Sequence, residues 1–342
     1  MSATINLEKK HFPVLLDELI KIISPRYSGT FLDCTFGQGG YSEKILEDPK
    51  NKVIAFDRDI DAIELSKKFK KLYNERFDFN HKKFSEIKTD NTQNIKAIIF
   101  DLGYSTDQIF DKKKGLSFNF SGKLNMKMGL NTFSAHEVIN KLDKEDLTKI
   151  FKYFGEEKYA KKISSSILRK RKKQIIKTED LVDIINKEKK NYNFKINKST
   201  KIFQSLRIFV NQEISELING LINAYRLIPI NSFIIVVTFH SLEDKIVKFF
   251  FKNYSEDKSI SRYLPKSKNK NKIFDLISKK AILPTAEEIK INPPSRSAKL
   301  RYARKISEDA NFDEFFLKFK KLLDIENIGK KLWLEKSLFF LF

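Results

Sequence analysis

The sequence is poor in cysteine and histidine, and it has no long apolar segment. Its 342 residues include one cysteine, Cys34, and four histidines, too few for an intrachain disulfide or for a zinc site built from these ligands. The longest wholly apolar stretches, such as 233–237, are a handful of residues long, whereas a membrane-spanning helix needs roughly 20. The first residues form no apolar run of signal-peptide length. We therefore expect a cytoplasmic protein with no metal site and no membrane attachment.

Glycine and proline are also scarce, and acidic residues are outnumbered. Eleven Gly and eight Pro exclude a collagenous or low-complexity disordered chain, while 41% apolar residues with 31 Phe and 11 Tyr can bury a sizeable core. Lys and Arg number 66 against 44 Asp and Glu, a net charge of +22. Because such a field attracts polyanions, nucleic acid is the first partner to consider. The alternative is a lysine-rich codon bias without functional meaning.

Short apolar runs alternate with helical periodicity in the first third of the chain. The candidate strands are 30–36, 52–56, 77–81 and 95–100. Strands that read as unbroken apolar runs and alternate with helices indicate a parallel sheet covered on both faces. Polar residues follow the strand ends directly, where open α/β sheets bind ligands.

The pattern changes in the middle of the chain. From about 112 to 200 no buried strand is evident and the periodicity is helical, and a buried-strand pattern returns at 233–239. We expect an α/β domain in two parts, 1–111 and 201–304, interrupted by an inserted helical substrate-recognition domain at 112–200. The remaining residues, 305–342, form a helical extension whose apolar end suits either a homodimer contact or docking on the core.

The glycines at 37, 39 and 40 follow the first candidate strand and precede a helix. Such a turn lets a ligand approach backbone N–H groups at a helix N-terminus. Asp57 lies 17 residues beyond Gly40, at the tip of the next strand, where a carboxylate can accept hydrogen bonds from both ribose hydroxyls. Since GQGG lacks the full GxGxxG pattern, a mononucleoside such as S-adenosylmethionine fits better than a dinucleotide.

Nine ordered segments resemble those of the bacterial 16S ribosomal RNA cytosine-N4 methyltransferases, the MraW family. They are HFPVLLDEL (11–19), DCTFGQGGYSEKIL (33–46), FDRD (56–59), FDLGYSTDQI (100–109), GLSFNFSGKLNMKM (115–128), FGEEKYAKKI (154–163), FQSLRIFVNQE (203–213), TFHSLEDKIVK (238–248) and NPPSRSAKLR (292–301). The resemblance covers about 11–304. It implies a class I, Rossmann-like S-adenosylmethionine-dependent methyltransferase sheet with an inserted helical domain. It also implies methyl transfer to the exocyclic N4 amine of a cytosine in the decoding centre of 16S ribosomal RNA, in the small ribosomal subunit.

The same resemblance implies a set of cofactor-binding residues. They are Gly39, Gly40, Tyr41, Asp57, Phe84, Asp101 and Gln108. Asp57 suits the ribose diol, Phe84 offers an apolar face for adenine, and Asp101 could hold the methionine ammonium. The group that accepts the proton of the cytosine amine is left open, because no Pro-Pro-aromatic sequence follows Asp101. The candidates are Asp101, Ser105, Asn125 and His240.

Three positions depart from the family pattern. Asn125 and Lys127 replace the carboxylate and arginine of the usual LDMRM, and Tyr41 replaces the histidine of GGHS. Asn125 can accept a hydrogen bond but cannot act as a base. A catalytically weakened RNA-binding or assembly factor is therefore a second hypothesis beside the methyltransferase. A dinucleotide-dependent oxidoreductase is a third, disfavoured by the incomplete glycine pattern.

Several other residues carry two interpretations each. His240 faces substrate or belongs to a helix start in which Ser241 caps and Asp244 completes a capping box. The basic run 169–173 suits RNA phosphates or a solvated helix end. Near the end of the chain, Arg296, Lys299 and Arg301 suit either phosphate contacts or packing on the core.

Overall fold

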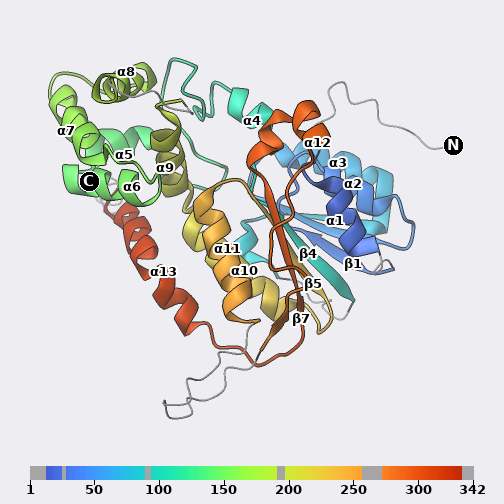
Figure 1. Ribbon diagram of the computed structural model, residues 1–342. Helices are drawn as coiled ribbons and strands as arrows, with labels where there is room; N and C mark the ends of the chain where they lie inside the picture. The colour runs from blue at the N-terminus through green and yellow to red at the C-terminus, as the bar shows by residue number, and fades with distance from the viewer. Residues whose placement is uncertain (1–12, 25–27, 89–93, 191–196, 256–271, 333–342) are drawn as a thin grey trace, which may run out of the picture. The chain divides into compact units, whose positions relative to one another are not determined.

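The computed structural model describes residues 13–24, 28–88, 94–190, 197–255 and 272–332 (Figure 1). The chain divides into two compact units: the first comprises 1–105 and 220–312, and the second comprises 106–219 and 313–342. Within the described residues, no helix combines the length and the apolar character needed to cross a bilayer.

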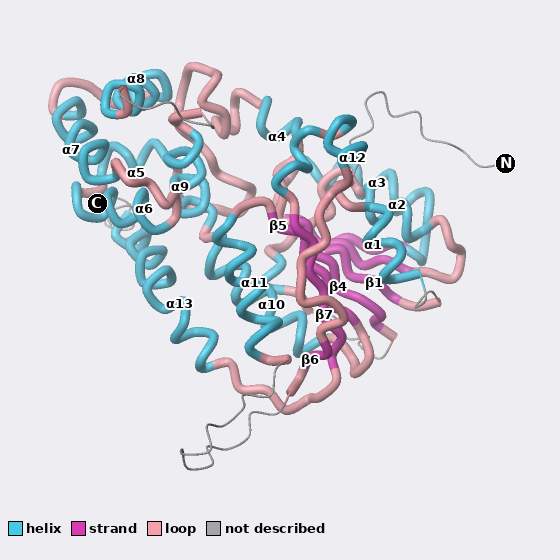
Figure 2. Tube along the Cα trace, in the orientation of Figure 1, coloured by secondary structure: helices cyan, strands magenta, loops and turns pink. Residues whose placement is uncertain are grey.

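The first unit is built on a seven-stranded sheet in the order β3-β2-β1-β4-β5-β7-β6 (Figure 2). The strands are β1 (Thr30–Asp33), β2 (Lys52–Asp57), β3 (Phe77–His81), β4 (Ile95–Asp101), β5 (Phe233–Thr238), β6 (Phe274–Asp275) and β7 (Lys299–Lys305). Strands β1 to β5 run parallel to their neighbours, and β7 is antiparallel to both β5 and β6. The prediction of a mainly parallel, Rossmann-like α/β sheet is confirmed.

Helices cover both faces of this sheet because alternate strand residues point to opposite sides. On one face, Phe31, Ala55 and Ile99 share an apolar core with residues of three helices. These helices are α1 (Leu16–Ile23), α2 (Gly40–Leu46) and α3 (Asp61–Tyr73). The opposite face carries α10 (Glu213–Leu227) and α11 (Ser241–Asn253) (Figure 1). There, a Cβ added to Gly220 of α10 would lie 3.6 Å from the Phe100 ring of β4.

The end of one strand differs from the expectation, and one further strand was not expected. β1 ends at Asp33 rather than at 36, because the chain turns off the sheet there into the glycine loop. The segment containing Lys299 and Arg301 proves to be an antiparallel strand, β7, whose residues 299–304 pair in register with 238–233 of β5. Apolar and basic residues are mixed along β7. The parallel strands were identified as continuous apolar runs, so this criterion did not identify β7.

The second unit is helical. Its helices are α4 (Thr106–Phe110), α5 (Ala135–Lys141), α6 (Lys144–Tyr153), α7 (Ala160–Arg171), α8 (Thr178–Glu188), α9 (Thr200–Asn211), the first part of α10, and α13 (Asp313–Glu326). Local sequence sets several helix starts: Ser134 and Glu137 form a capping box on α5, and Asp143 caps α6. The unit contains the expected insertion at 112–200 and also includes 201–219.

From Asp313 on, the described part of the C-terminal extension packs within the helical unit. Lys321 of α13 donates to the Tyr153 hydroxyl at 2.6 Å, and Lys331 pairs with Asp146 at the same distance. The carboxylate of Glu326 accepts from the backbone N–H groups of Ile214 and Ser215. The extension therefore caps the start of α10. The apolar end, 337–342, lies outside the described residues.

The segment 202–225 has an amphipathic periodicity that predicts one long helix, but in the structure it is two helices. Gln212 adopts a left-handed conformation with φ of 52°, which ends α9 and lets α10 begin at Glu213. The amphipathic periodicity continues across the break, so it did not reveal the change of direction. The N–H groups that the break leaves without helical partners at 214 and 215 bind Glu326.

Candidate active site

The candidate site lies at the carboxyl ends of β1, β2 and β4, in the middle of the sheet. The chain builds β1, β2 and β3 toward one edge and then returns to place β4 on the other side of β1. Such a reversal of strand order leaves a crevice at the strand ends, where open α/β sheets bind ligands. The three strands end in Asp33, Asp57 and Asp101. Thr35 links two of the ends, because its hydroxyl accepts the backbone N–H of Asp101 at 2.7 Å.

Asp57 is held in place by two backbone N–H groups. Gly37 donates to one carboxylate oxygen at 2.7 Å, and Asp59 donates to the other at 2.8 Å. Burial raises the pKa of Asp57, and these two hydrogen bonds offset part of the rise. A carboxylate has about four lone-pair sites, so two remain available. The structure therefore fixes the direction of the Asp57 carboxylate and leaves it able to accept two further hydrogen bonds.

The three glycines of the turn serve different purposes. Gly37 and Gly39 have positive φ, 51° and 74°, which favours glycine. A Cβ on Gly39 would lie 2.6 Å from the ring of Phe69, and one on Gly40 would lie 2.2 Å from Pro13. Gly39 and Gly40 thus permit close packing by the chain's own side chains, a requirement independent of any ligand.

Asp33 is an additional buried acid that the sequence did not single out. Its side chain is fully buried and accepts from the Ser42 hydroxyl at 2.6 Å and from the Thr35 backbone N–H at 3.3 Å. Burial raises the pKa of Asp33 to about 6, against the lowering effect of these hydrogen bonds. Asp33 thereby ties the end of β1 to the first turn of α2. Because the strand was expected to continue to 36, no pattern in the sequence marked Asp33 as a strand end.

Asp101 and Tyr41 lie together at the end of β4. Burial, together with the neighbouring charges of Asp33 and Glu243, raises the pKa of Asp101 to about 7, against the lowering effect of the hydrogen bonds from Gly103 and Tyr41. The buried Tyr41 hydroxyl donates to the carbonyl of Val14 and also contacts Asp101. A hydroxyl carries a single proton, so it can donate to only one of these acceptors at a time. Burial raises the pKa of Tyr41 well above its usual value, which keeps the hydroxyl protonated.

Phe84 stands beyond β3, half-buried on the face opposite α1 to α3. Its ring contacts the ring of Phe100 edge-on, with centroids 5.4 Å apart. A Cβ on Gly220 would lie 2.6 Å from the Phe84 ring, so the glycine allows α10 to approach it. The amide of Asn223 donates to the carbonyl of Ser85 at 2.6 Å and secures the same segment. Phe84 is therefore a fixed apolar wall.

His240 is the N-cap of α11, and the expected cap at Ser241 is wrong. The Glu243 backbone N–H faces His240 Nδ1 at 3.4 Å, while the Glu243 carboxylate accepts from the backbone N–H groups of Phe239 and His240. The capping box thus begins one residue earlier than expected, with Glu243 in its third position. The same carboxylate lies 3.0 Å from His240 Nε2. The imidazole of His240 is held largely by its own helix.

Asp244 binds two of the basic residues of β7, Lys299 and Arg301. Arg301 Nε lies 2.7 Å and Lys299 Nζ 3.1 Å from its carboxylate. Burial alone would raise the pKa of Asp244, but these hydrogen bonds produce a net lowering. The structure therefore supports the packing interpretation for Lys299 and Arg301, whereas Arg296 is exposed.

Two of the expected site residues lie in the second unit. Gln108 belongs to α4, and Asn125 to the loop that precedes α5. The Asn125 amide donates to the carbonyl of Lys113 at 3.1 Å, and its backbone carbonyl accepts from Ala135. Asn125 thus joins two parts of its own loop. The other expected residues, Gly39, Gly40, Tyr41, Asp57, Phe84, Asp101 and His240, belong to the first unit.

The family model and the curated relatives agree on one family. The model of the MraW methylase family matches residues 8–306. Ribosomal RNA small subunit methyltransferase H of Rickettsia prowazekii (strain Madrid E) is 37% identical over 305 residues, covering 88% of this chain and 100% of that protein. Its namesake in Orientia tsutsugamushi (strain Ikeda) is 39% identical over 311 residues, covering 87% and 99%. Among solved structures, an rRNA methylase from Streptococcus thermophilus has 9% identity and a TM-score of 0.39, covering 88% of this chain and 99% of its own.

Proposed function

The chain belongs to the MraW methylase family, and from this premise we propose that it methylates the exocyclic N4 amine of a cytosine in the decoding centre of 16S ribosomal RNA. The methyl donor is S-adenosylmethionine, and the RNA is presented in the small ribosomal subunit. The coarser activity, methylation of small-subunit ribosomal RNA, agrees with the names of the relatives.

The observation that best supports this proposal is the orientation and hydrogen-bonding capacity of the Asp57 carboxylate. Its carboxylate is oriented by the N–H groups of Gly37 and Asp59 and keeps capacity for two more donors. A ribose diol has two adjacent hydroxyls, which matches that capacity. Phe84 offers a fixed apolar surface on the same sheet edge, suited to adenine. The acceptor Asp57 and the apolar ring of Phe84 therefore fit the adenosine part of the cofactor.

S-adenosylmethionine, when bound, supplies an activated methyl group, so the chain's own residues mainly position the groups that react. The cytosine amine loses a proton as its nitrogen is methylated, and a group with a pKa near neutrality accepts a proton efficiently. Asp101, with its pKa raised to about 7, has this property. His240 is engaged in a capping box, and Asn125 has no basic oxygen. We assign proton acceptance to Asp101, and a positioning role to Asn125 through its bond to Lys113.

The net charge of +22 favours a polyanionic substrate. To reach a methyl group in the crevice, the cytosine has to leave its stack, which is least costly in an unpaired segment of RNA. The weakened-factor hypothesis rested on the amide of Asn125. That amide donates a hydrogen bond that a carboxylate could not donate, so its presence has a structural reason.

The direct test is transfer of labelled methyl from S-adenosylmethionine to small subunits purified from cells that lack the modification, followed by mapping of methylcytosine. We expect one N4-methylcytosine in 16S ribosomal RNA. Absence of transfer, or label at another base or atom, would contradict the proposal.

A paired test addresses the cofactor site. Asp57→Ala removes two hydrogen bonds to a charged acceptor, each contributing about 1.5–3 kcal/mol, so we expect the affinity for S-adenosylmethionine to fall at least about 100-fold in calorimetry. Asp61→Ala, at an exposed position on α3, is the control and should leave the affinity within about twofold. Retained affinity in the Asp57 variant would show that the adenosine binds elsewhere.

A further inference from the structure

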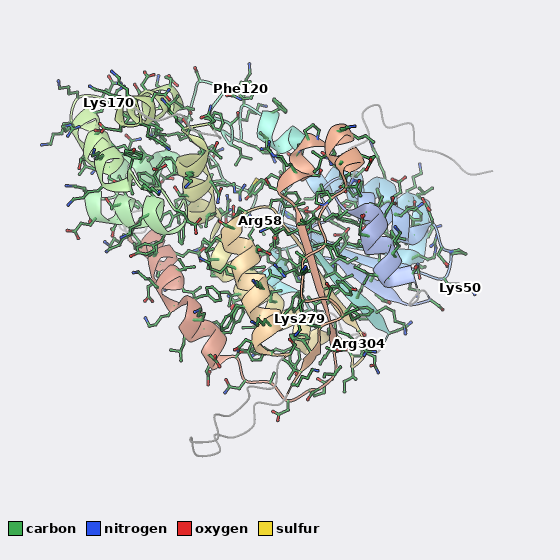
Figure 3. All side chains as sticks on the ribbon, in the orientation of Figure 1. Lys50, Arg58, Phe120, Lys170, Lys279 and Arg304 are labelled. Carbon is green, nitrogen blue, oxygen red and sulfur yellow. The ribbon has the colours of Figure 1, made fainter. Side chains whose placement is uncertain are left out.

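A pair of aromatic rings, one exposed and one half-buried, lies in the helical unit, outside the residues discussed above. Phe110 ends α4 and is 60% exposed. Its ring meets the ring of Phe120 at an angle of 66°, with centroids 6.2 Å apart. Lys112 places its ammonium 5.5 Å from the centre of the Phe120 ring. Figure 3 labels Phe120, which extends from the loop between α4 and α5.

The loop that carries Phe120 is held by its own backbone. Besides the bond from Asn125 to the Lys113 carbonyl, the backbone N–H of Met126 donates to the carbonyl of Lys114 at 2.7 Å. Gly115 has φ of 59°, and a Cβ there would lie 2.6 Å from the Lys123 carbonyl. The rings are therefore presented on a closed loop whose two arms are bonded together.

A second loop is bonded to the first at Gly122. Both the backbone N–H and the hydroxyl of Thr178 donate to the Gly122 carbonyl, at 3.1 and 2.9 Å. Thr178 begins α8, directly after residues 171–177, which contain no acid. The tertiary structure thus joins the loop of Phe120 to the basic run at the end of α7.

The basic residues of these two loops divide into engaged and exposed groups. Lys170 pairs with Asp180 at 2.6 Å, and Arg171 donates to the carbonyls of Ile139 and Leu142. The lysines whose side chains are exposed are Lys112, Lys113, Lys123, Lys172, Lys173 and Lys177. The acids on these loops are Asp111 and Glu179, which accept the backbone N–H groups of Lys113 and Gly122. The two bonded loops therefore carry a large excess of positive charge.

We propose that Phe110 and Phe120 form an aromatic platform on which unpaired bases of the RNA substrate stack, while the exposed lysines of the two loops bind its phosphates. The proposal rests on the proposed function for the identity of the RNA. Any base can stack on a phenylalanine ring, and an aromatic surface in a basic setting is the usual means of holding single-stranded nucleic acid. A protein partner fits less well, because lysine is depleted at protein interfaces and the apolar area here is small.

The binding test uses a single-stranded 16S fragment around the target cytosine and, separately, its duplex. We expect Phe110→Ala and Phe120→Ala each to weaken binding of the single strand by about 5- to 150-fold. Phe316→Ala is the matched control, since Phe316 is an aromatic residue 39% exposed on α13 of the same unit, and it should bind as the native protein does. If all three variants bind the single-stranded fragment with equal affinity, the proposed aromatic platform is refuted.

Stacking and charge have separate signatures. Phe110→Trp retains a ring, so binding should persist and the new indole fluorescence should be quenched by bases, relative to the native chain with its one tryptophan. Phe110→Leu keeps apolar bulk without a ring face and should bind as weakly as the alanine variant. Lys112→Gln should reduce the slope of log affinity against log salt by about 0.7. Binding by the leucine variant at native strength would refute stacking.

Kinetics on RNA separate this inference from the proposed function. We expect the platform variants to raise KM for RNA with kcat and S-adenosylmethionine affinity unchanged, because neither Phe110 nor Phe120 is among the residues expected to bind the cofactor. If the native protein transfers no methyl and the variants still lose RNA affinity, the proposed function fails and the platform stands. If the native protein methylates and the variants keep its KM, the platform alone is refuted.

Discussion

Glu326 offers a test of how the C-terminal extension stabilises the helical unit. Its carboxylate is 3% exposed and accepts the backbone N–H groups of Ile214 and Ser215 at 2.7 and 2.9 Å. Burial raises its pKa from 4.5 to about 7, the charge of Glu213 adds to the rise, and the hydrogen bonds from Ser215 and Ile214 oppose it. The perturbation is Glu326→Gln, which is neutral at every pH and keeps one carbonyl acceptor.

The sign and size of the effect follow from proton linkage. Between about pH 4.5 and 7 the unfolded chain has released the Glu326 proton while the folded chain retains it, so the folded state binds more protons there. The stabilisation from this group is therefore complete below pH 4.5 and is lost as the pH rises through 7. A shift from 4.5 to about 7 corresponds to about 3 kcal/mol. The free energy of unfolding of the variant minus that of the native protein should rise by this amount between pH 4 and 8.

The assay is urea unfolding at a series of pH values, followed by pulsed hydrogen exchange of peptides from α9 and α10, which reports on the helical unit. Subtracting the free energy of unfolding of the native protein from that of the variant removes the contribution of every titrating group that the two proteins share. Asp324→Asn is the control on the same helix, because Asp324 is 56% exposed and pairs with Lys320. The difference in the free energy of unfolding between this variant and the native protein should change by less than about 0.5 kcal/mol over the pH series. Parallel stability curves for the native protein and Glu326→Gln would refute the reasoning.

Three further substitutions test other contacts. Asn211 is fully buried and bonds to four groups, among them the Met126 carbonyl at 2.9 Å, so Asn211→Ala should cost about 2–4 kcal/mol in urea unfolding; a loss under 1 kcal/mol would contradict this. Lys189→Met leaves Glu157 buried without its 2.7 Å partner and should cost about 3–5 kcal/mol, most of it restored by adding Glu157→Leu; no restoration would be the adverse result. Gly40→Ala forces a Cβ to 2.2 Å from Pro13 and should lower both the melting temperature and the calorimetric affinity for S-adenosylmethionine. If neither value changes, the close packing of Gly40 against Pro13 is not required.

The sequence alone indicated the parallel part of the sheet and the acids at its tips. The runs at 52–56 and 95–100 are continuously apolar because both of their faces are buried, and Asp57 and Asp101 follow them at once. Since parallel strands all end on one side of a sheet, the meeting of these carboxylates at one edge follows from local patterns. The nine family segments added an expected activity, and the family model confirms the family itself.

Local patterns did not identify where α11 begins or where α9 ends. His240 caps α11 because Glu243 bonds back to its N–H, whereas serine is the more usual cap and Ser241 stood beside it. Amphipathic periodicity ran unbroken through Gln212, where the helix ends. A pattern within one segment records which side chains are buried, but not the direction in which the chain leaves a helix.

The number of positive charges was evident in the sequence, but their arrangement was decided by the tertiary structure. The run at 169–173 was equally compatible with phosphate binding and with a solvated helix end. The fold engages Lys170 with Asp180 and Arg171 with two carbonyls, and the bond between Thr178 and Gly122 joins the segment that follows this run to the loop that carries Phe120. Glu326 likewise meets a helix start 111 and 112 residues away. Composition determines the total charge and apolar content of a chain, whereas contacts between distant segments determine which groups pair with one another and which face a partner.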